Sequence, residues 1–168
     1  HIRKEQKADY DAIHALTRDA FAPMAFSDGT EADLITALRD QGNLTLSLVA
    51  DQDGVVVGHV AFSPVTIAGR HDGWFGLGPI AVRTDMQKRG IGTALMTEGI
   101  NQLRAAGARG CALIGNPAVY QGMGFENDPK ITYRDVPPKN VMRLVLAGQS
   151  PAGELRFVPA FEGDPNKE

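Results

Sequence analysis

The sequence predicts a mixed α/β (α+β) fold in which a mostly antiparallel sheet is flanked by helices. Two amphipathic helical patterns come early in the chain, and the dipeptide Asp53-Gly54 separates two strand-like segments as a hairpin turn does. A loop with two glycines then connects an apolar strand to the longest helical pattern, residues 90–106. Because this helix lies between strands at 74–82 and 109–114, we expect a right-handed crossover connection.

The first predicted elements are a short strand and an amphipathic helix. Residues 2–4 can form the strand, and Asp9 is predicted to cap the helix. Ile13, Leu16 and Ala20 recur at the spacing of one helical face, so we expect them to face the core.

A loop over residues 21–29 separates this helix from a second one. Thr30 is predicted as the N-cap of the second helix, and Asp33 as the residue that completes a capping box. Gly42 is predicted to end the helix. The buried face of this helix is expected to hold Leu34, Ile35 and Leu38.

Strands are predicted for most of the remaining chain. Residues 44–50 and 55–67 form the two strands of a hairpin, and residues 68–73 turn the chain into the strand at 74–82. A short helix is expected at 117–121. Further strands are expected at 109–114, near 131–133, at 141–146 and, as an edge strand, at 155–158.

The composition indicates one globular domain. The chain has 168 residues, and we expect residues 1–161 to form a single domain and the polar residues 162–168 a disordered tail. The apolar fraction is 43%, and no run approaches the ~20 apolar residues of a membrane span, so no membrane partner is expected. A formal charge of −3 argues against a nucleic-acid partner, because nucleic-acid-binding domains tend to be strongly basic.

Cysteine usage favours a reducing compartment. The single cysteine, Cys111, cannot form an internal disulfide and lies in an apolar run typical of a core strand. The first seven residues are too charged for a secretory signal, so a cytoplasmic location is expected.

The strand, loop and helix over residues 79–95 predict an anion site. Gly90 and Gly92 lack the side chains that would keep a ligand away from the backbone. The helix that begins there points unpaired N–H groups and the positive end of its dipole at the same spot. Lys88 and Arg89 add positive charge. Together these features favour a phosphate or pyrophosphate ligand.

Two common phosphate-binding patterns do not fit this loop. No Gly-Lys-Ser/Thr closes it as in a Walker loop, and Leu95 stands where the third glycine of the dinucleotide fingerprint belongs, which disfavours a nucleotide-binding oxidoreductase. The pattern Gln/Arg-x-x-Gly-x-Gly/Ala does fit, filled by Gln87, Gly90 and Gly92. A second block, GNPAVYQGMGF at 115–125, has a short helix followed by a Gly-Phe turn. The two blocks resemble the acetyl-CoA motif and the fifth-strand region of the GNAT family of N-acetyltransferases.

The resemblance implies a sheet whose fourth and fifth strands splay apart, with the pantetheine arm of acetyl-CoA lying in the gap like an added strand. The Gly78-Pro79 irregularity suits this arrangement, because it leaves nearby backbone groups without a ladder partner. The resemblance also implies direct transfer of an acetyl group from acetyl-CoA to a primary amine of a small molecule or peptide, by a monomer or homodimer. No Cys/His cluster suggests a metal. The implied cosubstrate-binding residues are Ile80, Ala81, Val82, Gln87, Lys88, Arg89, Gly90, Ile91, Gly92, Thr93, Asn116 and Tyr120.

Tyr120 matches the family's general acid, which assists departure of the thiolate. A phenol has a pKa of ~10 and a simple thiol ~8.5, so the hydroxyl is expected to act mainly as a hydrogen-bond donor to sulfur. The alternative is an aromatic residue that packs the short helix onto the sheet. Asn116 resembles a position that faces pantetheine or the acceptor, although an Asn before Pro117 also begins turns.

The general base is less clearly indicated. The strand at 74–82 contains no carboxylate, and the developing oxyanion can be met by a backbone N–H near Val82. His59 and Glu31 are candidate bases. A histidine among valines is more often a satisfied core or surface residue, and an acid in a first helical turn is also favoured by the helix dipole. Ordered water is the default base.

Acceptor selection is expected, by resemblance, in the loop at 21–28, with Glu31, and in the late turn at 133–140. The loop is unusually apolar for its polar flanks, which suggests a wall for an apolar part of the acceptor, although packing on the core is an equal alternative. The apolar residues of the loop are Phe21, Met24 and Phe26.

A non-catalytic acyl-CoA-binding module of the same fold remains the alternative function.

Overall fold

The computed structural model describes residues 1–25 and 27–162. Phe26, one of the three apolar loop residues, and residues 163–168 of the predicted tail lie outside the described residues. The chain forms two compact units. The first unit comprises His1–Phe62 and Gly78–Gly99, and the second comprises Ser63–Leu77 and residues from Ile100 onward.

Both units contain helices and strands. The first unit holds β1 (Ile2–Lys4), α1 (Tyr10–Phe21), α2 (Glu31–Asp40) and β2 (Leu46–Gln52). Three elements contribute residues to both units, namely β3 (Val55–Ile67), β4 (Trp74–Val82) and α3 (Ile91–Ala105). The second unit holds β5 (Gly110–Ile114), α4 (Pro117–Tyr120), β6 (Glu126–Asn127), β7 (Ile131–Thr132), β8 (Val141–Val145) and β9 (Gly153–Phe157).

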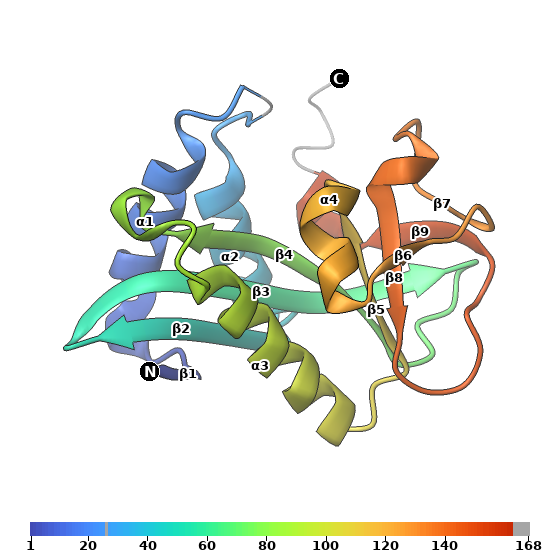
Figure 1. Cartoon of the computed structure of the whole chain (residues 1–168), viewed down its shortest axis with the longest axis horizontal. Helices are drawn as coiled ribbons and strands as arrows, with labels where there is room; N and C mark the ends of the chain where they lie inside the picture. Colours follow the sequence, from blue (N-terminus) through green and yellow to red (C-terminus); the bar gives the residue numbers. More distant parts are fainter. Residues whose placement is uncertain (26, 163–168) are drawn as a thin grey trace. The chain divides into compact units, whose positions relative to one another are not determined.

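The strands hydrogen-bond in the order β1-β2-β3-β4-β5-β8-β6, while β9 pairs with β3 and β7 (Figure 1). In the main sheet β4 and β5 are parallel, as expected for two strands joined through α3. The pairs β1–β2, β2–β3, β5–β8 and β6–β8 are antiparallel. The predicted mixed, mostly antiparallel sheet is therefore confirmed.

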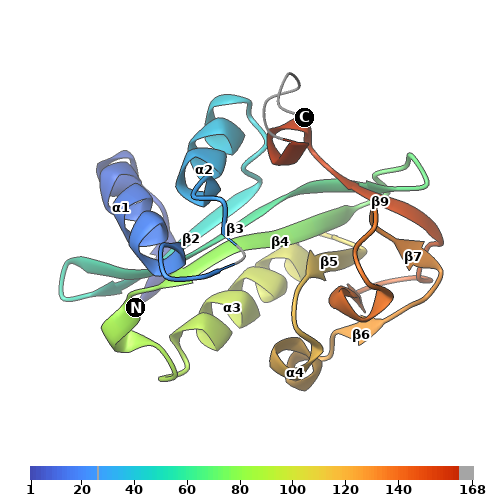
Figure 2. The same ribbon diagram turned by 90° about the horizontal axis from the view of Figure 1, so that it is seen from above.

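In the first unit, helices cover both faces of the strands. Figure 2 shows α1 and α2 on one face of β2 and β3 and the start of α3 on the other. Ile13, Ile35 and Val49 form a cluster on the first face. On the second face the Phe62 ring lies so close to Gly99 of α3 that a Cβ there would come within 2.2 Å of the ring. Glycine at this position therefore allows the helix to approach the strand.

The predicted capping interactions at α1 and α2 are wrong, although both residues stand at the N-cap. Asp9 makes no side-chain cap bond, because its carboxylate accepts hydrogen bonds from the Arg3 guanidinium and the Gln6 N–H. Thr30 makes none either, because its hydroxyl donates to Asp28. Asp33 accepts from His14 of α1 instead of completing a capping box. In each case a neighbouring polar group competes with the helix end.

The hairpin extends further toward its turn than predicted. β2 was expected at 44–50 and spans Leu46–Gln52, because its ladder with β3 continues to the pair Gln52↔Val55. The turn residues Asp53 and Gly54 both have positive φ, as a type I′ hairpin requires. β6 was not predicted, since it is only two residues long and carries no apolar pattern.

Candidate active site

The end of β4 and the start of α3 form one corner of the first unit. The registered pairs between β4 and β5 end at Gly76↔Ala112, while β4 continues to Val82. A Cβ added at Gly92 would meet only Val82 and Ile80 side-chain atoms, at 3.7 and 3.8 Å. The structure therefore brings together three residues predicted to contact the cosubstrate. Ala81 is different, because its side chain is buried in the core.

The loop before α3 is exposed and positively charged. Gln87 donates from Nε2 to the Val82 carbonyl at 3.1 Å, which ties the loop to the end of β4. Lys88 has φ +64° and Gly90 φ +85°, so the backbone adopts the left-handed conformation at two positions before the helix begins. Lys88 and Arg89 are both exposed. The first-turn N–H groups of α3, including those of Ile91, Gly92 and Thr93, have no intrahelical acceptor and can bind an anion.

Glu31 is the first residue of α2, directly after the α1–α2 loop. Its Oε1 accepts a hydrogen bond from Ser27 Oγ at 2.7 Å, and Ser27 in turn accepts from the Gly29 N–H at 3.1 Å. The Glu31 side chain is half-buried. Of the apolar loop residues, Phe21 packs on the core while Met24 is exposed.

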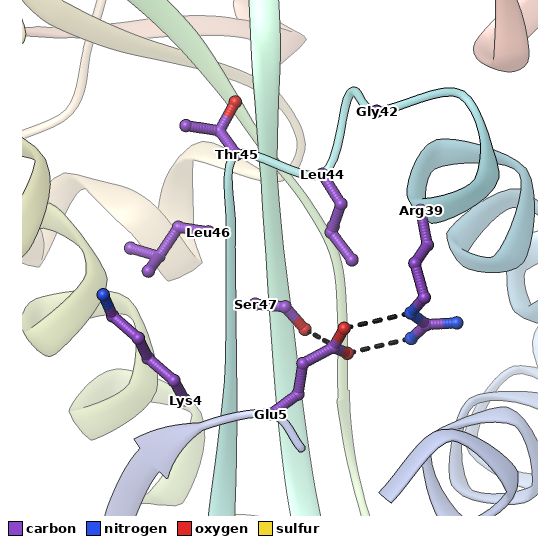
Figure 3. Close-up of a pocket in the computed structure, with 8 residues that line it drawn as sticks. All are labelled: Lys4, Glu5, Arg39, Gly42, Leu44, Thr45, Leu46 and Ser47. Carbon is purple, nitrogen blue, oxygen red and sulfur yellow. Dashed lines mark hydrogen bonds and ion pairs between the residues drawn. The ribbon is translucent and has the colours of Figure 1, made fainter. Parts of the chain in front are cut away.

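His59 is completely buried in the first unit, within a polar network that lines a cavity of about 250 Å³. Arg39 holds Glu5 through two hydrogen bonds of 3.0 and 2.8 Å, and Ser47 Oγ donates to Glu5 at 2.7 Å (Figure 3). Ser47 Oγ also lies 2.7 Å from His59 Nε2. Because the single hydroxyl proton goes to Glu5, His59 Nε2 must be the donor to Ser47, and Nδ1 carries the lone pair.

Burial determines the charge state of this histidine. Desolvation lowers the pKa of His59 to about 4, although the charge of Glu5 opposes the shift. The imidazole is therefore neutral at pH 7. Its Nδ1 has no hydrogen-bond partner among the described residues. The burial of His59 means that any role as a base requires a relay to the reacting groups.

In the second unit, the segment after β5 places Tyr120. Asn116 is the N-cap of α4, and its Oδ1 accepts from the Ala118 N–H at 3.0 Å. The Tyr120 ring is half-buried and meets Phe125 edge to face, with centroids 6.2 Å apart. Burial raises the pKa of Tyr120 above its ordinary value, so the hydroxyl stays protonated at neutral pH. The tyrosine thus packs and also keeps a proton to donate.

A contact of Tyr120 with Gly115 was not predicted. Gly115 lies against the Tyr120 ring, and its backbone is held by Asn140 from the late turn. The same turn contains Arg134, which has φ +47°. Gly115 begins the block at 115–125 that resembles the family. The sequence alone does not tell whether this glycine is needed to make room for a neighbouring side chain or to form a turn.

Metal binding, the cysteine and membrane-spanning helices also bear on function in the described part of the chain. Among residues 1–25 and 27–162, no group of three or more His, Cys, Asp or Glu side chains is arranged to hold a metal ion. Cys111 is buried, and burial raises the pKa of its thiol. No helix in the described part of the chain is long and apolar enough to cross a membrane.

Known proteins resemble this chain in sequence. The sequence model of the acetyltransferase (GNAT) family matches residues 10–125. The uncharacterized N-acetyltransferase YhbS of Escherichia coli K12 is 40% identical over 126 residues, which cover 74% of this chain and 72% of that protein.

Solved structures also resemble it. A GNAT family acetyltransferase from Brucella melitensis, solved in complex with acetyl-CoA, has a TM-score of 0.87 and 43% identity, covering 96% of this chain and 97% of the other. YhbS from Escherichia coli, solved in complex with CoA, has a TM-score of 0.89 and 32% identity, covering 96% and 91%. The matched region includes both the glycine loop and Tyr120, and on these grounds the chain belongs to the GNAT family of acetyltransferases.

Proposed function

We propose that this protein is an N-acetyltransferase that moves an acetyl group from acetyl-CoA directly to a primary amine of a small molecule or peptide. The observation that carries the proposal is the exposed loop at the N-terminus of α3, in a chain 43% identical to an acetyltransferase solved with acetyl-CoA. Residues 1–161 act as one domain in this proposal, because the family match over 10–125 includes residues of both units.

The glycine loop binds the pyrophosphate of CoA in this proposal. The N–H groups of the first turn of α3 face the ligand, and Gly92 has no side chain to keep the ligand from the backbone. Lys88 and Arg89 attract the phosphates. Backbone groups of Ile80 and Val82 pair with the two amides of the pantetheine arm.

Three requirements define the chemistry. The amine must be neutral, the oxyanion must be stabilised and the thiolate must leave. We assign the oxyanion to a backbone N–H near Val82 and the thiolate to a hydrogen bond from the Tyr120 hydroxyl. Asn116 caps α4 through Oδ1, which leaves its Nδ2 group for pantetheine or the acceptor.

Proton removal is assigned to ordered water. An alkylammonium has a pKa of ~10.4, whereas the pKa of His59 is lowered to about 4, so His59 is too weak to take the proton directly. Glu31 can hold a cationic amine or receive a proton from water, since one of its carboxylate oxygens is fixed by Ser27.

The proposal is tested by an assay that follows release of free CoA thiol from acetyl-CoA across a panel of amines. Thiol release that depends on the amine, with an acetylated product seen by mass spectrometry, is the expected result. The second candidate, a module that binds acyl-CoA without turnover, is favoured by the buried state of His59 and the absence of a carboxylate from β4. Tight CoA binding without turnover of any amine would replace the first proposal by the second.

A further inference from the structure

We infer that the end of β5 is a positioning device for Tyr120, in which Gly115 provides a bare surface for the ring and Asn140 clamps that surface in place. The inference rests on the proposed function, in which the Tyr120 hydroxyl assists the leaving thiolate. All of its parts lie in the second unit.

The first observation is the contact between Gly115 and the ring. A Cβ built at Gly115 would lie 2.5 Å from Cε2 and 3.1 Å from Cδ2 of Tyr120, and 3.2 Å from Cδ1 of Leu113. Such a Cβ forces the ring to move by about 1 Å, because carbon atoms in contact prefer separations of about 3.5–4.0 Å. The Tyr120 ring therefore occupies space that only a glycine leaves free.

The second observation concerns the backbone of Gly115. Glycines in turns of this chain, such as Gly124 with φ +93°, have positive φ. Gly115 does not have positive φ, so its conformation is open to any residue. The missing side chain at position 115 is thus explained by the contact with Tyr120 and not by the turn.

The third observation is the clamp. The Gly115 N–H donates to the Asn140 carbonyl at 2.9 Å, and Asn140 Nδ2 donates back to the Gly115 carbonyl at 3.1 Å. The turn that carries Asn140 is itself held by Asn127, whose Nδ2 lies 2.7 to 3.2 Å from the carbonyls of Pro138, Lys139 and Val141. Both polar groups of Gly115 are thereby engaged away from the ring.

The ring also contacts Phe125, which is 1% exposed and belongs to the core of this unit. With Gly115 and Phe125 both fixed, the phenol has a defined position, and so does its hydroxyl. A misplacement of about 1 Å at a reacting group can lower a rate about a hundredfold. Gly115 and Asn140 are therefore positioning residues, which act through Tyr120.

The test is a double-mutant cycle between Gly115→Ala and Tyr120→Phe, with Gly122→Ala as matched control. Gly122 lies in the segment after α4, has no heavy atom within 4 Å of a built Cβ, and lacks positive φ. We expect Gly115→Ala to lower kcat roughly ten- to a hundredfold with CoA affinity changed less than about twofold, and Gly122→Ala to change neither. In the Tyr120→Phe background, Gly115→Ala should cost less than about threefold, because the hydroxyl that it misplaces is already gone.

A crystal structure of Gly115→Ala provides a readout besides activity, with a ring displaced by about 1 Å expected. An unmoved ring, or an equal loss of kcat in both backgrounds, would overturn the inference. Full kcat in Tyr120→Phe would instead overturn the assignment of Tyr120 in the proposed function. If Gly115→Ala does not fold, Asn140→Ala replaces it in the cycle, since it removes one hydrogen bond and leaves the backbone of the turn intact. The same pattern with a smaller loss is expected, and an equal loss in both backgrounds again contradicts the inference.

Discussion

At the scale of single residues, burial decides what the ionisable groups of this protein can do. Tyr120 and His59 are both placed in surroundings that disfavour their charged forms, so the phenol keeps its proton and the imidazole loses one. The phenol is therefore suited to donate, and the imidazole exists at pH 7 as a neutral hydrogen-bonding group beside Ser47.

Tyr120→Phe is expected to lower kcat by roughly ten- to a thousandfold and to leave CoA affinity unchanged, because it removes one donor and little volume. Because burial raises the pKa of Tyr120, raising the pH from 6 to 9 should not remove this contribution. Steady-state kinetics with a chemistry-limited amine measures the effect. Tyr10→Phe is the control, since the Arg39 guanidinium lies 3.8 Å from the Tyr10 ring centroid and the substitution keeps that ring. Full kcat in Tyr120→Phe would reduce the residue to a packing role.

His59 should make the free energy of unfolding depend on pH. Its folded pKa of about 4 lies below the ordinary 6.5, so between these values the unfolded chain binds more protons than the folded protein. This contribution is fully present above pH 6.5 and is lost as pH falls toward 4, by up to about 3 kcal/mol.

Urea unfolding of wild type and His59→Gln at pH 7 and pH 4.5 measures this term. The amide of glutamine can still donate to Ser47 but does not titrate, so the variant should lose less stability than wild type over this range. Asp9 also has a lowered pKa, and its contribution cancels in the comparison because His59 is not among its causes. Burial opposes the lowered pKa of Glu5, which Arg39, Ser47 and, least of all, the charge of His59 produce, so this last part is measured together with His59. Equal losses in the two proteins would show that His59 does not titrate as its burial implies.

At the scale of elements, the two glycines at the start of α3 are needed for different reasons. Gly90 needs its positive φ, whereas Gly92 lacks positive φ and a Cβ added there makes only ordinary van der Waals contacts, with Val82 and Ile80. A substitution at Gly90 therefore strains the protein, while one at Gly92 mainly affects a ligand that approaches the backbone.

Gly92→Val is expected to weaken CoA binding by more than about tenfold, equivalent to about 1.4 kcal/mol, without unfolding the protein. The fold should tolerate the change because the nearest side-chain atoms lie 3.7 and 3.8 Å from the built Cβ. Calorimetry with CoA measures the affinity, and S-acetylpantetheine, which lacks the pyrophosphate, is the matched control ligand. Unchanged CoA affinity in a folded variant would falsify the assignment of this loop.

At the scale of the whole molecule, acceptor choice is expected to depend on segments outside the glycine loop. Glu31 in the first unit is fixed by Ser27, and Met24 of the same loop is exposed. We expect Glu31 to attract an incoming amine through its charge, and Met24 to contact an apolar part of that amine.

Glu31→Gln should lower kcat/KM more for dicationic than for monocationic amines, and more at low salt, because the lost attraction is screened by ions. Met24→Ala should affect amines with apolar substituents most. A panel of amines that differ only in charge or in chain length measures both effects. If each variant changes kcat/KM by one common factor for all amines, the loop does not select the acceptor.

Much of the fold follows from local patterns. The period of apolar residues places α1 and α2, and Asp53-Gly54 places the hairpin turn. The capping interactions expected of Asp9 and Thr30 are replaced by hydrogen bonds to Arg3 and to Asp28. Helical periodicity does not predict this, because it does not tell whether a side chain at the N-cap bonds the helix end or a neighbouring polar group. β6 also depends on its partner, since Glu126 is extended by pairing with β8.

The sequence by itself determined the family and the glycine loop with its charges, because these depend on residues close together in the chain. Only the tertiary structure decided the burial and charge state of His59. Its hydrogen bond with Ser47 belongs to a network that continues to Glu5 and Arg39, which are distant in the sequence. The tertiary structure also placed the Tyr120 ring against Gly115, whose backbone is hydrogen-bonded to Asn140. Burial and contact depend on which distant segments pack together, and spacing along a sequence does not contain that information.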